Sequence, residues 1–215
     1  MITEEQIRFW DDNGYLKYGK VLEQGEVAEL LEKFGRVARI ESEGGDDSSI
    51  EFKVGHARGD KDVEYEAGGI RQYLNLWKRD EAYNKVVRHP LVTGIAKQLL
   101  KTPALRLWHD HIISKPPEEN DRFQFHQDFY NWPLADPNIL TCWIALDDAT
   151  VANGCMHVVP GSHRDPRFSV EARKLELEEL AKNPDARTER VIMGEHPASF
   201  GVPVELKSGE CMFHH

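Results

Sequence analysis

Hydrophobic residues in the first hundred positions recur at helical spacing and predict three helices. Thr3 can cap a first helix that ends at Gly14, because its hydroxyl accepts from the free N–H groups of a first turn. A second helix is expected over residues 24–40. Its apolar residues recur every three or four positions: Val27, Leu30, Leu31, Phe34, Val37 and Ala38. A third helix is expected over residues 81–100, interrupted near His89, because the following proline disfavours helical backbone there.

From Leu105 onward the pattern changes to short runs rich in Ile, Val, Leu and Trp, separated by clusters of Gly, Pro, Asn and Asp. Such runs predict short strands. Helices followed by strands indicate an α+β fold with a β-sandwich or barrel at its centre. Residues 41–69 are polar and glycine-rich, which fits either a binding loop or a plain surface loop. Residues 171–190 form a charged, helix-prone insertion.

Composition restricts the protein class. The 215 residues are 40% hydrophobic, which suits one domain with one sizeable core. The net charge of −10 argues against a nucleic-acid partner, and no apolar stretch approaches the roughly 20 residues of a membrane span. The N-terminus has none of the features of a signal peptide. Cys142, Cys155 and Cys211 lie in apolar runs without C-x-x-C spacing, so we expect reduced thiols in a cytoplasmic protein.

The segment QFHQDF carries the first residues with metal-binding chemistry, His126 and Asp128. In a strand, residues two apart point to the same face, so we expect the imidazole and the carboxylate to project together. Two histidines and one carboxylate form the facial triad that suits Fe(II) and oxygen chemistry. His109 and His111 form a second pair with the same spacing. We favour the first pair because it supplies the anionic ligand.

Four segments then appear in a fixed order: KPP at residue 115, HQD at 126, WIALDDAT at 143 and NGCMHVVPGSH at 153. In this combination the chain resembles the phytanoyl-CoA dioxygenase family, and the N-terminal TEEQIRFWDDNGYL is similar to the family's opening. The resemblance is close over residues 105–165 and looser over the rest. It is specific to the family and does not identify a substrate.

The resemblance implies a double-stranded β-helix, the cupin-like jelly roll. Helices from residues 1–100 would pack on a core that begins near residue 105, within a single domain over residues 1–215. It also implies Fe(II) bound by His126 and Asp128, with 2-oxoglutarate and O2 as cosubstrates. By position, Gln72, His111 and Trp143 would contact the 2-oxoglutarate. Trp143 also fits the simpler role of a core aromatic residue.

The activity that the resemblance implies is hydroxylation of an unactivated carbon of a small molecule, with release of succinate and CO2. Asp128 favours this outcome, because halogenating relatives have a small residue at that position. We find no basic cluster suited to a CoA phosphate, so an acyl-CoA substrate is not expected. Two alternatives stay open: a non-catalytic module that binds metal or 2-oxoglutarate, and a cupin-like metalloenzyme that uses His109 and His111 without 2-oxoglutarate. The sequence leaves the substrate and the oligomeric state open.

A facial triad needs a second histidine from a distant strand. The run from Gly209 to His215 is similar to the start of the family's Gly-acidic-x-x-x-x-His pattern, which implies that the liganding histidine and an arginine for 2-oxoglutarate follow His215. We therefore expect the natural protein to continue beyond His215 with the closing strands. The fallback is that His214 or His215 completes the triad, with His215 preferred. Adjacent residues of a strand face opposite sides, so only one can do so.

Overall fold

The computed structural model describes residues 1–42, 51–54, 70–115, 123, 125–132, 134, 136–165, 170–182 and 201–215. The helices of this part of the chain are α1 (Glu4–Asn13), α2 (Gln24–Ser42), α3 (Glu81–Val87), α4 (Pro90–Leu99), α5 (Asp128–Asn131) and α6 (Val170–Lys182), with short 3-10 turns η1 (Leu76–Lys78), η2 (Val151–Asn153) and η3 (Ser162–Arg164). The strands are β1 (Tyr15–Lys20), β2 (Glu51–Val54), β3 (Arg71–Leu74), β4 (His111–Ser114), β5 (Thr141–Ile144), β6 (Met156–Val158), β7 (Val202–Val204) and β8 (Glu210–His214). The mixed helix-and-sheet prediction is confirmed, but the expected order of helices first and strands from residue 105 is wrong, because β1, β2 and β3 precede Leu105.

Local sequence signals account for the helix boundaries. Thr3 and Gln6 form a reciprocal capping box at the start of α1, and Gly14 ends the helix in the left-handed conformation. The expected third helix is two helices, α3 and α4, separated at His89, and proline takes the first position of α4. The polar segment 41–69 lies largely outside the described residues, apart from 41–42 and β2.

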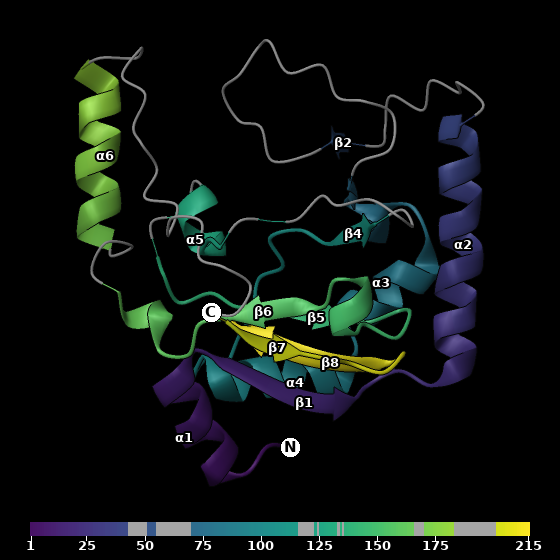
Figure 1. Ribbon diagram of the computed structural model, residues 1–215, viewed down its shortest axis with the longest axis horizontal. Coiled ribbons are helices and arrows are strands. Elements are labelled where there is room, and N and C mark those ends of the chain that lie inside the picture. The colour runs from purple at the N-terminus through teal and green to yellow at the C-terminus, as the bar shows by residue number, and fades with distance from the viewer. Residues whose placement is uncertain are drawn as a thin grey trace.

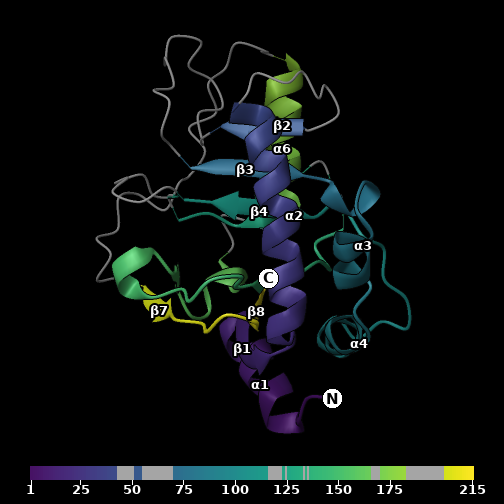
Figure 2. The ribbon, with the colours of Figure 1, turned by 90° about the vertical axis from the view of Figure 1, so that its right-hand side faces the viewer.

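All the strand pairs that the structure describes are antiparallel. They form a three-stranded sheet in the order β1-β8-β5, a second in the order β2-β3-β4, and the pair β6-β7. In both ribbon views α2 runs alongside the two three-stranded sheets, from the level of β1 up to β2 (Figures 1 and 2). Two contacts hold it there: the ring of Phe34 meets Tyr73 of β3 edge-on at 5.1 Å, and the Tyr83 hydroxyl of α3 donates to the Leu30 carbonyl at 2.8 Å.

The central strand β8 separates two hydrophobic clusters. Cys211 and Phe213 face the helical layer and pack with residues of α1, α2, α3 and α4. Met212 faces the opposite side, where it packs with Val204 and Leu206. All three β8 residues have no exposed surface. Among the helices that the structure describes, none has the length and hydrophobicity that crossing a membrane requires.

A partly buried cluster of rings packs η3 against the first helix and the end of β8. The His163 ring lies 5.7 Å from the His215 ring, and His215 lies 6.1 Å from Trp10 of α1. His163 Nε2 donates to the Asp11 carbonyl at 3.2 Å, which places the ring hydrogen on Nε2. Its Nδ1 is buried and has no partner among the described residues. Protonating Nδ1 would therefore bury an unsatisfied N–H group.

The close approach of Gly209 to the β1–α2 connection generates a first prediction. Gly209 has a φ of +85°, its carbonyl accepts from Val21 and Leu22, and a Cβ there would overlap the Leu22 carbonyl oxygen. We expect Gly209→Ala to lower the free energy of unfolding by about 1–3 kcal/mol or more, measured by urea denaturation. Gly35→Ala is the matched control: this exposed α2 glycine has open space around it, and alanine should stabilise by about 0.5–1 kcal/mol. If the two substitutions change the free energy of unfolding equally, the prediction is wrong.

The partly buried His163 ring generates a second prediction. Burial lowers its pKa, and the nearby Arg164 guanidinium lowers it further, against the opposing Asp11 and Asp12 carboxylates; His215 faces it from β8. The unfolded chain then binds a proton below its ordinary pKa of about 6.5 while the folded chain resists it, so stability falls as pH falls. We expect His163→Gln to reduce the slope of unfolding free energy against pH between about pH 7 and 5. If the variant and the unmodified protein show the same slope, His163 does not cause the pH dependence of stability.

Candidate functional site

Asp128 is the first residue of the short helix α5, and the structure corrects the expectation that His126 and Asp128 lie in a strand. The residue between them, Gln127, is extended, with φ −110° and ψ 133°. One extended residue is enough to turn its two neighbours to the same side. The two side chains therefore come together as expected, although the secondary structure differs. Their nearest atoms, His126 Nε2 and Asp128 Oδ1, lie 3.3 Å apart.

Two further side chains meet the Asp128 carboxylate from the β1-β8-β5 sheet. Thr141 of β5 donates its hydroxyl to Oδ2 at 2.6 Å. His214 of β8 donates from Nε2 to the same oxygen at 3.1 Å. Thr141 and His214 are paired directly across the two strands, so the register of the sheet places both on the face toward α5.

These contacts keep the Asp128 carboxylate ionised. Burial by itself would raise the pKa of Asp128, but the hydrogen bonds from His126 and His214 outweigh it and hold this pKa well below its ordinary value. The side chain is only 21% exposed, so the charge is partly shielded from water. A buried carboxylate beside two imidazoles is a donor set that fits a divalent transition metal.

Taken together, the side chains described around Asp128 are not spaced as they would be around a bound metal ion. Within the part of the chain that the structure describes, no three His, Cys, Asp or Glu side chains are spaced as a metal-binding group. The imidazoles of His126 and His214 instead contact the carboxylate directly. An ion would take the place of at least one of these contacts, because a liganding imidazole nitrogen must lose its hydrogen.

The two C-terminal histidines lie on opposite sides of the sheet, as adjacent strand residues must. The structure brings His214 to Asp128, whereas the preferred fallback ligand, His215, packs against Trp10 and His163. The preference for His215 over His214 therefore does not agree with where the structure places them.

Gln72 and His111 occupy one face of the β2-β3-β4 sheet. Gln72 pairs with Ile113 and is buried, while Leu74 pairs with the exposed His111. His109 connects this sheet with α5, because its ring meets Trp132, at the end of α5, edge-on at 5.3 Å. Gln72 and His111 thus lie on a sheet whose strand β4 follows the segment that contacts the end of α5. Their contact with 2-oxoglutarate stays a prediction.

Trp143 lies two residues from Thr141 on β5 and is paired with Met212 of β8. It therefore shares the sheet face of Thr141 and His214, and it packs against the hydrophobic cluster around Met212 with its side chain only partly buried. This position suits both interpretations of Trp143, as a cosubstrate contact and as a core residue.

Sequence reasoning missed the contact of Thr141 with Asp128, and it named His214 only as a fallback ligand, without its hydrogen bond to Asp128. A lone threonine in an apolar run carries no signal of its own. The alternation of β8 could have singled out His214, because Cys211 and Phe213 are the residues expected to face the core. The cross-strand register that joins it to Thr141 depends on tertiary structure.

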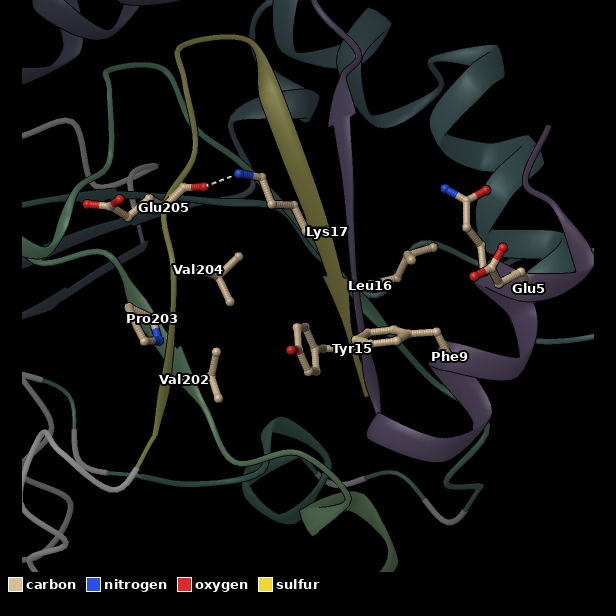
Figure 3. Close-up of a pocket in the computed structure, with 10 residues that line it drawn as sticks. Glu5, Phe9, Tyr15, Leu16, Lys17, Val202, Pro203, Val204 and Glu205 are labelled. Atoms are coloured by element: carbon tan, nitrogen blue, oxygen red, sulfur yellow. Dashed lines mark hydrogen bonds between the residues drawn. The ribbon is translucent and has the colours of Figure 1, made fainter.

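A separate groove of about 530 Å³ lies between α1, β1 and β7 (Figure 3). Phe9, Tyr15, Val202 and Val204 line it, and Lys17 closes one side by donating to the Glu205 carbonyl at 2.6 Å. Its lining includes neither Asp128 nor the side chains that contact it. The groove is therefore separate from the candidate site at the Asp128 carboxylate.

Comparison with known proteins agrees with this chemistry. The family model described as phytanoyl-CoA dioxygenase matches residues 10–215. A probable phytanoyl-CoA dioxygenase of Caenorhabditis elegans is 27% identical over 171 residues, covering 76% of this chain and 54% of the relative. An ectoine dioxygenase of Nocardia farcinica is 27% identical over 167 residues, covering 76% of this chain and 52% of the relative. The chain thus spans about half the length of these relatives.

Solved structures show the same relationship. The non-haem α-ketoglutarate-dependent carbocyclase SnoK from nogalamycin biosynthesis superposes with a TM-score of 0.69 at 25% identity, covering 100% of this chain and 74% of SnoK. EctD from S. alaskensis, solved with bound Fe, has a TM-score of 0.67 at 20% identity and covers 99% of this chain and 68% of EctD, a likeness of fold. Because the family model extends over nearly the whole sequence, the chain belongs to the phytanoyl-CoA dioxygenase family.

Proposed function

We propose that the protein is an Fe(II)- and 2-oxoglutarate-dependent dioxygenase that hydroxylates an unactivated carbon of a small molecule. The observation that carries this proposal is the meeting of His126 with the ionised carboxylate of Asp128 in a chain of this family. A neutral imidazole and a carboxylate are ligands that Fe(II) accepts, and a facial set leaves positions open for cosubstrates. His126 and Asp128 would supply two of the three protein ligands of such a set.

The residues of the chain would bind and orient the reactants. His126 and Asp128 would hold the iron, and Gln72, His111 and Trp143 would contact 2-oxoglutarate. Gln72 suits that role because its side-chain amide can donate hydrogen bonds to a carboxylate and is buried on the β3 strand. When bound, iron and 2-oxoglutarate supply the oxidation by O2, with release of succinate and CO2.

The finer fold that accompanies this function is a jelly roll within one domain over residues 1–215. Two features of the described strands support it. The β1-β8-β5 sheet and the β6-β7 pair enclose a common hydrophobic cluster, and Ala149 and Leu206 form a bridge between the segments that follow β5 and β7. Two antiparallel sheets that share a core in this way are the basis of a β-sandwich.

The substrate is proposed only as a small molecule. Relatives at about the same identity include enzymes named for ectoine and for phytanoyl-CoA, so similarity does not choose between them. The alternative metal pair, His109 and His111, has its rings 5.4 Å apart, and His109 packs on Trp132. These contacts favour a packing role for His109 over metal binding.

The decisive experiment measures cosubstrate binding and turnover separately. Under anaerobic conditions, adding Fe(II) and 2-oxoglutarate should produce a broad visible absorption band, and admitting O2 should then yield succinate. A band without succinate would favour the non-catalytic binding module. Metal binding without any 2-oxoglutarate-dependent band would favour a cupin-like metalloenzyme.

The metal site generates a third prediction. His126→Ala and Asp128→Ala should each weaken Mn(II) binding at least about 100-fold in isothermal titration, because each removes a ligand. The thermal midpoint should change little for His126→Ala, whose side chain is 34% exposed, and should fall for Asp128→Ala, because Thr141 and His214 lose their acceptor. Asp148→Ala is the matched control, because this exposed carboxylate pairs with Lys207 away from the site. Unchanged affinity in both site variants would overturn the metal assignment.

The position of Trp143 generates a fourth prediction. Trp143→Ala should raise the 2-oxoglutarate concentration for half-maximal turnover about 10-fold or more, and lower the free energy of unfolding by less than the roughly 3–5 kcal/mol of a fully buried ring. Trp77→Ala is the control, because Trp77 packs against the helical cluster and should affect only stability. A large loss of stability at Trp143 with an unchanged cosubstrate requirement would identify it as a core residue.

A further inference from the structure

The two oxygens of the Asp128 carboxylate have different surroundings. Oδ1 faces His126 Nε2 at 3.3 Å. Oδ2 accepts one hydrogen bond from Thr141 at 2.6 Å and another from His214 at 3.1 Å. The first of these has the short length typical of a hydroxyl that donates to an ionised carboxylate. Two donors on one oxygen fix the rotation of the whole carboxylate group.

We propose that Thr141 and His214 hold Oδ2 of Asp128 so that Oδ1 is the oxygen offered to the metal beside His126. In this arrangement His214 is a positioning residue and not the third ligand. The inference rests on the proposed function, because it assumes that a metal binds at His126 and Asp128.

The spacing on the Oδ1 side fits two neighbouring ligands of one ion. Two donors at about 2.1 Å from a first-row divalent ion, at right angles, lie about 3 Å apart. The 3.3 Å between His126 Nε2 and Asp128 Oδ1 is close to this value. His126 is also 34% exposed, against 17% for His214, so it lies on the more accessible side of the carboxylate.

The hydrogen-bonding state of His214 argues against its binding the metal. A carboxylate oxygen only accepts, so the contact with Oδ2 places the ring hydrogen of His214 on Nε2. Its Nδ1 is buried and has no partner among the described residues. If Nε2 bound a metal, the hydrogen would move to Nδ1, where it would be buried without an acceptor. Liganding imidazoles ordinarily donate that second N–H to an acceptor.

The sheet explains why Thr141 and His214 act together. They are direct partners across β5 and β8, and the flanking pair Cys142 and Phe213 is buried in the helical cluster. The strands therefore cannot shift relative to each other without disrupting the core. This rigid pair supports the start of α5, which consists of only four residues.

The test compares the affinity for Co(II) or Mn(II) alone, by isothermal titration on the full-length protein. Thr141→Val removes the hydroxyl at nearly constant shape and should weaken binding about 10- to 100-fold, as loss of a ligand's hydrogen-bond partner does. Thr141→Ser keeps the hydroxyl and should bind within about 3-fold of the unmodified chain. Thr93→Val is the matched control: its hydroxyl bonds the His89 carbonyl in α4, and its loss should leave the affinity unchanged.

The same substitution at both histidines separates a ligand from a positioning residue. Glutamine retains a donor near the position of Nε2, so His214→Gln should keep the affinity within about 5-fold and leave the visible spectrum of bound Co(II) unchanged. His126→Gln should lose at least about 100-fold and alter that spectrum, because it removes a nitrogen ligand. Thermal unfolding of each metal-free variant shows whether a loss of affinity comes from misfolding.

The outcomes distinguish this inference from the proposed function. Equal losses at His214 and His126 would make His214 a ligand and overturn the inference, as would Thr141→Val binding like the unmodified chain. In both cases the metal site itself would stand. If the unmodified chain binds neither metal, or if His126→Gln has no effect, the metal site fails and the inference fails with it.

Discussion

The alternation of side chains along β8 is the constraint on which the structure depends. This strand is central in its sheet, and its residues Cys211, Met212 and Phe213 have no exposed surface. Cys211 and Phe213 complete the cluster beneath the helices, while Met212 completes the cluster between the sheets. A shift of one residue would exchange the two sets, so the register is strongly specified. The same alternation directs His214 toward Asp128.

In the candidate site, the strand β8 helps to orient the charged carboxylate of Asp128. Asp128 belongs to a helix too short to be stable alone, so its orientation depends on partners outside α5. Thr141 and His214 come from the sheet, and His126 comes from the preceding segment. Their hydrogen bonds offset the cost of burying the carboxylate and keep it ionised. An ionised, oriented carboxylate is what a divalent metal requires of this position.

Membership of the phytanoyl-CoA dioxygenase family concerns the whole chain, whereas the local geometry concerns the few side chains around Asp128. The family model covers residues 10–215, which agrees with the order of motifs along the chain. The geometry concerns only the described residues, and there it brings together one histidine and one aspartate of the motif. It adds a threonine that no motif contains. The motifs thus locate the candidate site, and the sheet arranges the side chains around the Asp128 carboxylate.

Although it missed the strands β1, β2 and β3, which precede Leu105, the sequence alone determined the start of α1, the break at His89, the strands after Leu105, and the pair His126 and Asp128. These depend on local signals: capping at Thr3, the proline after His89, and the spacing of apolar residues. Local signals could not reveal that Asp128 begins a helix, or that His214 and not His215 reaches it. Those outcomes required the pairing of β5 with β8. Pairing depends on packing between residues that are distant in sequence, and only the tertiary structure decides it.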